Sequence, residues 1–200
     1  MRGAFVLPLV PLQDVVLLPG ERCALSGSGK PSSAILERAG AFGGAVVASL
    51  ADGDSVHEIG VTAIVSTDAD GDSGLFGISR CRLLSLVNDD VAMVRAERFP
   101  ERPAAERRQT TVARLLHKRY RRLMDRLGRE LGAVPDSDLT ALTWKVTAEL
   151  GLPAEQQQGF LNVPDPLTRG RLLLLALREL ERRERFLHPW AHLRTTNPWN

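Results

Sequence analysis

Hydrophobic and polar positions follow a strand-like pattern up to about residue 98. Short β-favouring runs are separated there by turns rich in Gly, Asp, Ser and Asn. A single helical segment over 30–40 interrupts them, with Ser32 or Ser33 as its N-cap and Gly40 at its end. The runs predict strands over 5–12, 44–51, 58–67, 73–87 and 91–99.

Helical periodicity replaces this pattern after a polar, proline-containing stretch at 98–109. Apolar residues recur at steps of three and four, and they predict helices over 110–130, 136–151, 152–163 and 165–187. We therefore expect an α+β fold with two parts. The first, residues 1–100, is a β-rich subdomain: a small bent sheet or pseudo-barrel with one inserted helix. The second, residues 101–200, is an α-helical bundle with a long C-terminal helix.

Bulk composition places few limits on function. The chain has 200 residues, of which a quarter are charged, as in ordinary soluble proteins. Cys23 and Cys81 are too few for a disulfide scaffold, so we expect a reducing compartment. Pro8, Pro11 and Asp14 interrupt the apolar start, and no apolar run approaches the roughly 18 residues of a membrane helix. These features predict a cytoplasmic protein with no membrane partner.

Charge is distributed unevenly along the chain. Residues 1–98 contain 8 Lys or Arg and 12 Asp or Glu, whereas residues 101–130 contain 10 and 4. The predicted helix 107–129 carries this excess through Arg107, Arg108, Arg114, Lys118, Arg119, Arg121, Arg122 and Arg126. Phosphate contacts from such a helix would make a nucleic-acid-associated protein, which is the alternative function. Because Tyr120 belongs to the apolar face and no base-stacking motif is present, we instead expect a solvated face that pairs with the acidic half, without nucleic acid as a partner.

Three segments imitate chemical sites, and each lacks a required residue. In "ALSGSGKPSS", Pro31 replaces the hydroxyl residue of a Walker A loop and Ala24 replaces its first glycine. In "TDADGDSG", the aspartates match half of an EF-hand loop, but Ser79 stands where the glutamate ligand belongs. In "HPWAH", His188 and His192 have no further ligands nearby in sequence. The sequence therefore predicts no catalytic residue, no cofactor and no metal, and "TDADGDSG" reads as an acidic hairpin turn.

The order of features along the chain resembles one family. "LPLVPLQDVVLLPG" is similar to the opening strand of the Lon protease N-terminal domain, also called the Lon substrate-binding domain. "SSAILERA" resembles the helix that follows, and "EIGVTAIVS" and "GISRCRLLSL" resemble the family's E-x-G and G-x-x-R-x-R strands. "LGLPAEQQQGFLNVPDPLTRGRLLLLAL" is similar to its short helix and its D-x-x-x-R long helix. The resemblance spans nearly the whole chain, and the polar "SGSGKPSS" departs from the family pattern.

This resemblance implies a non-enzymatic module that binds exposed apolar segments of unfolded or damaged polypeptides, as an adaptor beside a protease or chaperone. The ATPase and protease modules of a full Lon protease do not fit in 200 residues, so the chain resembles a stand-alone or excised copy. A groove between the two halves, or strand addition at an open sheet edge, would hold the polypeptide. The candidate contact residues are Leu17, Leu18, Phe186 and Trp190.

Overall fold

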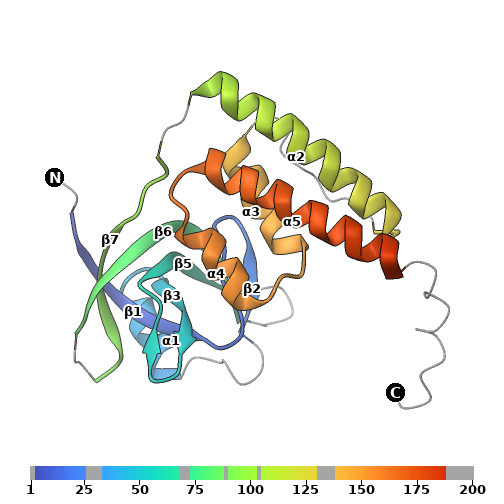
Figure 1. The fold of residues 1–200 in the computed structure, drawn as a ribbon. Coiled ribbons are helices and arrows are strands. Elements are labelled where there is room, and N and C mark those ends of the chain that lie inside the picture. Colours follow the sequence, from blue (N-terminus) through green and yellow to red (C-terminus); the bar gives the residue numbers. More distant parts are fainter. Residues whose placement is uncertain are drawn as a thin grey trace, which may run out of the picture.

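The computed structural model describes residues 3–25, 33–67, 73–87, 90–102, 105–129 and 138–187. Within them lie the strands β1 (Phe5–Leu12), β2 (Arg22–Ala24), β3 (Ala45–Asp52), β4 (Ser55–Val56), β5 (Ile59–Thr67), β6 (Ser73–Val87) and β7 (Met93–Arg98). The helices are α1 (Ser33–Gly40), α2 (Glu106–Arg126), α3 (Leu139–Glu149), α4 (Ala154–Asn162) and α5 (Pro166–Leu187). The predicted α+β class is confirmed, including the helix inserted among the strands (Figure 1). The sequence pattern did not predict the two shortest strands, β2 and β4.

Five strands close into a ring. Its order is β1, β7, β6, β5 and β3, and β3 returns to pair in parallel with β1, with Leu9 opposite Val47. The other pairings of the ring are antiparallel. Every strand of the ring therefore has a neighbour on each side, and only the short β2 and β4 lie outside this circuit in the described part of the chain. Within the described residues, the ring leaves only short stretches of unpaired edge for strand addition, such as Phe5–Pro8 of β1 on the side away from β7.

Some expectations fall on segments outside the described residues. These are the residues 26–32 of the glycine-rich segment, the turn residues 68–72, and the tail 188–200 with Trp190. The antiparallel pairing of Thr67 with Ser73 nevertheless confirms that β5 and β6 form a hairpin.

The core has three apolar clusters, and α3 joins two of them. Alternation along the strands sends Val10 and Leu12 into one cluster and Leu9 into another on the opposite face of the sheet. In α3, Trp144 packs with the sheet cluster, whereas Leu142 packs with the helical cluster. A helix that is buried on both sides in this way connects the sheet to the helices through side-chain packing.

α2 and α5 run side by side in the same direction (Figure 1). Val112 lies beside Gly170, and further along the pair Arg119 Nη1 lies 3.6 Å from Glu181 Oε2. Among the described residues, the main contacts of α2 are with α3 and α5, whereas we expected it to pair with the acidic strand-rich half. Among the helices that the structure describes, none is long and apolar enough to span a membrane.

Two motif glycines mark close approaches of backbone to backbone. A Cβ atom on Gly60 would lie 2.6 Å from the carbonyl oxygen of Ala48, and one on Gly77 would collide with the carbonyl oxygen of Leu18. Both glycines are buried, so the neighbouring segments have no room to move away. The glycines of the E-x-G and G-x-x-R-x-R segments are therefore required by packing.

We expect Gly77→Ala to lower the free energy of unfolding by about 1–3 kcal/mol, because the new methyl group overpacks against backbone. Gly159 in α4 is a matched control, since nothing lies within 4 Å of a Cβ atom there. Gly159→Ala is expected to leave stability unchanged or raise it by up to about 1 kcal/mol through helix propensity. Urea unfolding of both variants measures the difference, and equal midpoints would contradict the packing argument.

Candidate functional site

Arg80, from β6, points from the sheet into the helical half. Its pairing opposite Val61 directs the side chain to the face that α3 and α4 cover, and only 1% of the side chain is exposed. Its Nη1 atom donates to the carbonyl oxygens of Leu161 and Val163, both at 2.9 Å. These carbonyls belong to the end of α4 and the segment after it, so Arg80 fixes the position of that segment on the sheet.

Arg169, from α5, approaches the same place from the helical side. Its side chain has no exposed surface. The Nε atom donates to the hydroxyl of Thr143 at 2.9 Å, and Nη1 donates to the carbonyl oxygen of Val163 at 2.9 Å. Asp165 begins α5 by accepting hydrogen bonds from the backbone N–H groups of Leu167 and Thr168. The D-x-x-x-R segment thus caps its helix and delivers the arginine one turn later.

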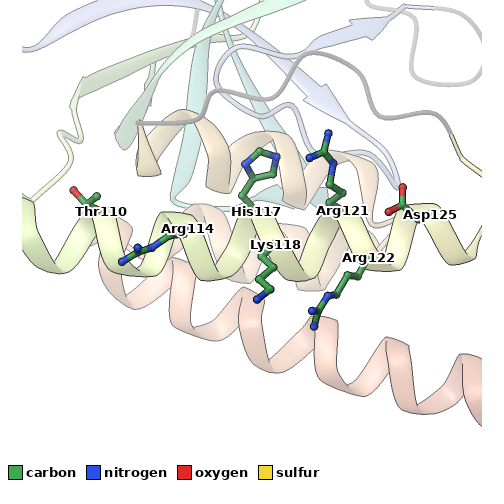
Figure 2. Close-up of a pocket in the computed structure, with 7 residues that line it drawn as sticks. All are labelled: Thr110, Arg114, His117, Lys118, Arg121, Arg122 and Asp125. Atoms are coloured by element: carbon green, nitrogen blue, oxygen red, sulfur yellow. The ribbon is translucent and has the colours of Figure 1, made fainter.

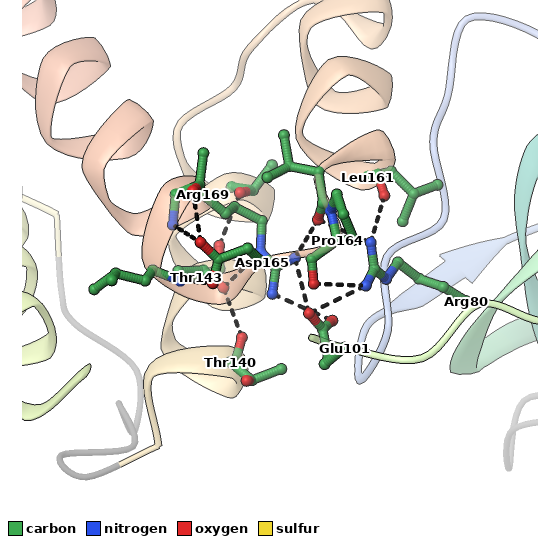
Figure 3. A network of polar contacts seen from close by, with 12 residues as sticks. Arg80, Glu101, Thr140, Thr143, Leu161, Pro164, Asp165 and Arg169 are labelled. Atoms are coloured by element: carbon green, nitrogen blue, oxygen red, sulfur yellow. Dashed lines mark hydrogen bonds and ion pairs between the residues drawn. The ribbon is translucent and has the colours of Figure 1, made fainter. Parts of the chain in front are cut away.

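Glu101 bridges the two arginines (Figure 3). Its Oε2 atom lies 3.1 Å from Nη2 of Arg80, and its Oε1 atom lies 3.3 Å from Nη2 of Arg169. Burial raises the pKa of Glu101, while the two guanidinium groups act in the opposite direction. Burial lowers the pKa of Arg169 to about 10, although the negative charge of Glu101 acts to raise it. At this pKa the arginine stays charged at neutral pH. The cluster therefore carries two positive charges and one carboxylate.

Aromatic rings cover the two buried cations. The guanidinium carbon of Arg169 lies 3.5 Å from the ring centroid of Trp144, and that of Arg80 lies 4.7 Å from the ring of Phe99. Such contacts stabilise a cation by electrostatic attraction to the ring face, and more strongly where water is excluded. The rings supply part of the solvation that burial removes.

A hollow of about 620 Å³ opens above this cluster, between the strands and α3. We call it the junction hollow. Its floor includes Arg80, Glu101 and Trp144, and 30% of the Glu101 side chain remains exposed. Its other lining residues are Pro19, Gly20, Ile78, Ser79, Arg98, Phe99, Pro100, Asp138, Thr140 and Ala141. The expected groove between the two halves is therefore present in the structure.

Exposed apolar side chains continue from the hollow along β6 and β5. Ile64 lies directly opposite Phe76, and Ile78 follows two residues later. The register shift near Thr62 leaves Ile78 without a partner residue in β5, at the point where it also lines the hollow. Ile64, Phe76 and Ile78, the apolar strip, are 45%, 43% and 49% exposed.

The candidate contact residues from the sequence are distributed differently. Leu17 and Leu18 are buried in the core cluster of the sheet, and they line a separate hollow of about 410 Å³ next to β2 and the end of α3. Phe186 is 74% exposed near the end of α5, away from the junction hollow. Trp190 lies outside the described residues. The structure brings none of the described three to the junction hollow, and their contact with a polypeptide stays a prediction.

Sequence reasoning did not single out the residues that build the hollow. Arg80 and Arg169 appeared in the sequence analysis only as positions within two family motifs. Their contact with one carboxylate was not predicted, because nothing in a sequence shows that residues 89 positions apart meet. The apolar strip had a signal: β6 carries large apolar residues on both of its faces. When a strand carries large apolar residues on both faces and the core covers only one of them, the other face is an exposed apolar surface.

We also considered the two cysteines and the side chains that could bind a metal ion. Cys81 is buried, which raises the pKa of its thiol to about 12, and Cys23 is half-buried with a pKa that burial also raises. Thiols that stay protonated are poor nucleophiles. Within the described ranges, no group of three His, Cys, Asp or Glu side chains is arranged to hold a metal ion.

Comparison with known families identifies the chain. Residues 6–179 match the model of the ATP-dependent protease La (LON) substrate-binding domain. The chain belongs to this family. The predicted resemblance to the Lon substrate-binding domain is confirmed, and the domain that defines the family is a non-catalytic module. No curated protein matches the chain in sequence.

Solved structures share the Lon substrate-binding fold. The N-terminal domain of Mycobacterium avium complex Lon protease aligns with a TM-score of 0.64 and 21% identity, over 87% of this chain and 98% of that one. The Lon N-terminal domain protein from Xanthomonas campestris aligns with a TM-score of 0.61 and 20% identity, over 86% of this chain and 98% of that one. At these identities the likeness concerns the fold.

We expect Arg169→Met to lower the free energy of unfolding by about 3 kcal/mol, because it removes one partner from a buried ionic cluster. Arg171→Met, two residues further along α5 at an exposed position, is the control and should change it by less than about 0.5 kcal/mol. Thermal and urea unfolding measure both. A cluster without structural importance would give the two variants the same stability.

Proposed function

We propose that this Lon substrate-binding domain protein binds exposed apolar segments of unfolded or damaged polypeptides at the junction hollow and the apolar strip. The observation that carries the proposal is the continuity of the two features, since Ile78 belongs to both. Half-exposed apolar side chains scattered singly are common on protein surfaces. Three that follow one another across two paired strands, at the rim of a hollow, are typical of a binding surface.

Burial of apolar area would provide the binding energy. Each strip residue keeps nearly half of its surface in contact with water. Covering a fully exposed aliphatic or aromatic side chain is worth about 1.5–3 kcal/mol, so each of these contributes on the order of 1 kcal/mol when a ligand covers it. Such a surface recognises apolar character and size in place of a defined sequence, as a module for unfolded chains requires.

Polar groups at the hollow would orient the bound backbone. The exposed part of Glu101 and the side chain of Asp138 are acceptors for N–H groups, and Arg98 is an exposed donor for carbonyls. Most edges of the ring strands are already paired with a neighbouring strand. We therefore expect side chains and isolated polar groups to hold the bound polypeptide, in preference to strand addition. The buried arginines below keep the floor fixed, which reduces the ordering cost of binding.

The proposal predicts that Phe76→Ser combined with Ile78→Ser weakens binding to a permanently unfolded protein. Reduced, carboxymethylated α-lactalbumin is a suitable probe, with affinity measured by fluorescence anisotropy. Losing two contacts of about 1 kcal/mol each corresponds to a roughly thirtyfold higher Kd.

The matched control is Leu84→Ser combined with Leu86→Ser, at the other end of β6. These side chains are 48% and 64% exposed, so the control removes as much apolar surface from the same strand. It should change the Kd by less than twofold. An equal loss in both double variants would show that binding follows general surface hydrophobicity, and an unchanged Kd in the first would remove the strip from the binding site.

The protein would act as an adaptor when a polypeptide held here is passed to a protease. This part of the proposal rests on the family, whose model is named for an ATP-dependent protease. We expect the wild-type chain to raise the rate at which a Lon-type protease degrades the unfolded probe, and the strip double variant to lose that effect. Binding without any change in the degradation rate would limit the function to capture.

A further inference from the structure

The outward side of α5 carries large apolar side chains at coiled-coil spacing. Leu172, Leu175 and Phe186 are 40%, 57% and 74% exposed, although the helix packs along its length against α2 and α3. Steps of three and four residues connect them through Glu179 and Arg182, which are exposed as well. We call these five positions the α5 seam.

Helical geometry separates the α5 seam from the core. Leu173 and Leu177 have no exposed surface and pack in the helical cluster with residues of α2 and α3. At 3.6 residues per turn, the seam falls on the opposite side of the same helix. Its apolar side chains therefore remain available to a partner that lies along α5.

Arginines repeat beside the seam with a period of seven residues. Arg171, Arg178 and Arg185 each precede a seam residue by one position, and all three are exposed. On the other side of the seam Arg183 is exposed too. None of these four arginines forms an ion pair with another described residue. In a coiled coil these flanking positions select the partner helix by charge.

The flanking arginines oppose a second copy of this chain as the partner. In a parallel pair of α5 helices, Arg178 would face Arg183 of the other copy, five residues further along. In an antiparallel pair, Arg178 would face Arg185. Both orientations place like charges together, which lowers the stability of the pair. A partner with acidic flanks would instead be attracted in either orientation.

The outer side of α2 is also basic, but it lacks apolar anchors. Figure 2 shows a hollow there that is lined by Thr110, Arg114, His117, Lys118, Arg121, Arg122 and Asp125. No large apolar side chain is among these lining residues. Helix docking depends on apolar anchors, and exposed ion pairs alone contribute little. The α5 seam combines both kinds of contact.

We propose that the α5 seam docks an acidic amphipathic helix of a partner protein, which lies along α5 as in a coiled coil. Apolar residues of that helix would cover Leu172, Leu175 and Phe186, and its glutamates would pair with the flanking arginines. Glu179 and Arg182 are neighbours on one helix, so they can neutralise each other inside the contact. The seam contributes no residue to the junction hollow, so this contact is independent of the capture of unfolded chains.

The test uses a fluorescent synthetic peptide of three heptads, with leucine at the a and d positions and glutamate at e and g. Its binding to the full chain is measured by anisotropy at 150 mM NaCl, where charges further apart than about 8 Å are largely screened. Leu175→Ser combined with Phe186→Ser should raise the Kd at least tenfold, because two apolar contacts are lost. Circular dichroism checks that this variant keeps its helices. Failure of the wild-type chain to bind the peptide would overturn the proposal.

Charge reversal separates the seam from general charge. The first triple variant is Arg171→Glu, Arg178→Glu and Arg185→Glu. It should bind the glutamate peptide at least tenfold more weakly and prefer a matched peptide with lysine at e and g. The second triple variant makes the same charge change on the outer side of α2: Arg114→Glu, Lys118→Glu and Arg121→Glu. It should keep the preference for the glutamate peptide.

Three further results would contradict the docking of an acidic helix on α5. One is equal weakening by both triple variants, and another is a first triple variant that does not exchange its peptide preference. The third comes from sedimentation velocity of the chain alone. A dimer that is lost when Leu175 and Phe186 are replaced by serine would assign the seam to a second copy.

Discussion

The carboxylate of Glu101, held between two almost fully buried arginines, is the constraint on which the arrangement of strands and helices depends. Removing two cations from water is expensive, and one carboxylate does not repay the cost alone. Carbonyls at the end of α4 and just after it, the hydroxyl of Thr143 and two aromatic rings provide the remaining stabilisation of the cations. Because the arginines come from β6 and α5, and their partners from α3, the end of α4 and the segment after β7, these elements must hold one mutual position for the charges to be satisfied.

The proposed polypeptide-binding surface uses a support that this arrangement makes rigid. The junction hollow lies directly on the ionic cluster, so its floor does not need to become ordered when a polypeptide arrives.

Much of the fold was predictable because its patterns are local. Short β-favouring runs bounded by turn residues located the five longer strands, and apolar steps of three and four residues located the helices. The ring confirms the expected small bent sheet or pseudo-barrel. The pairing that closes it was not predictable, since the parallel pairing of β1 with β3 leaves no mark on either strand. The site was predictable only as a groove between two halves. Leu17 and Leu18 have an apolar character that suits a core and a surface alike, and only the structure shows that they belong to the core cluster of the sheet.

The hydrogen bond from Arg80 to the carbonyl of Leu161 joins residues 81 positions apart. On a ribosome that adds about 5–20 residues per second, roughly 4–16 s separate the synthesis of the donor from that of its acceptor. Once β7 has been synthesised, the strand ring has all of its strands, yet a guanidinium group on its helix-facing side still lacks its final partners. The nascent sheet therefore presents to solvent, for some seconds, the same charged and apolar surface that the finished protein keeps covered.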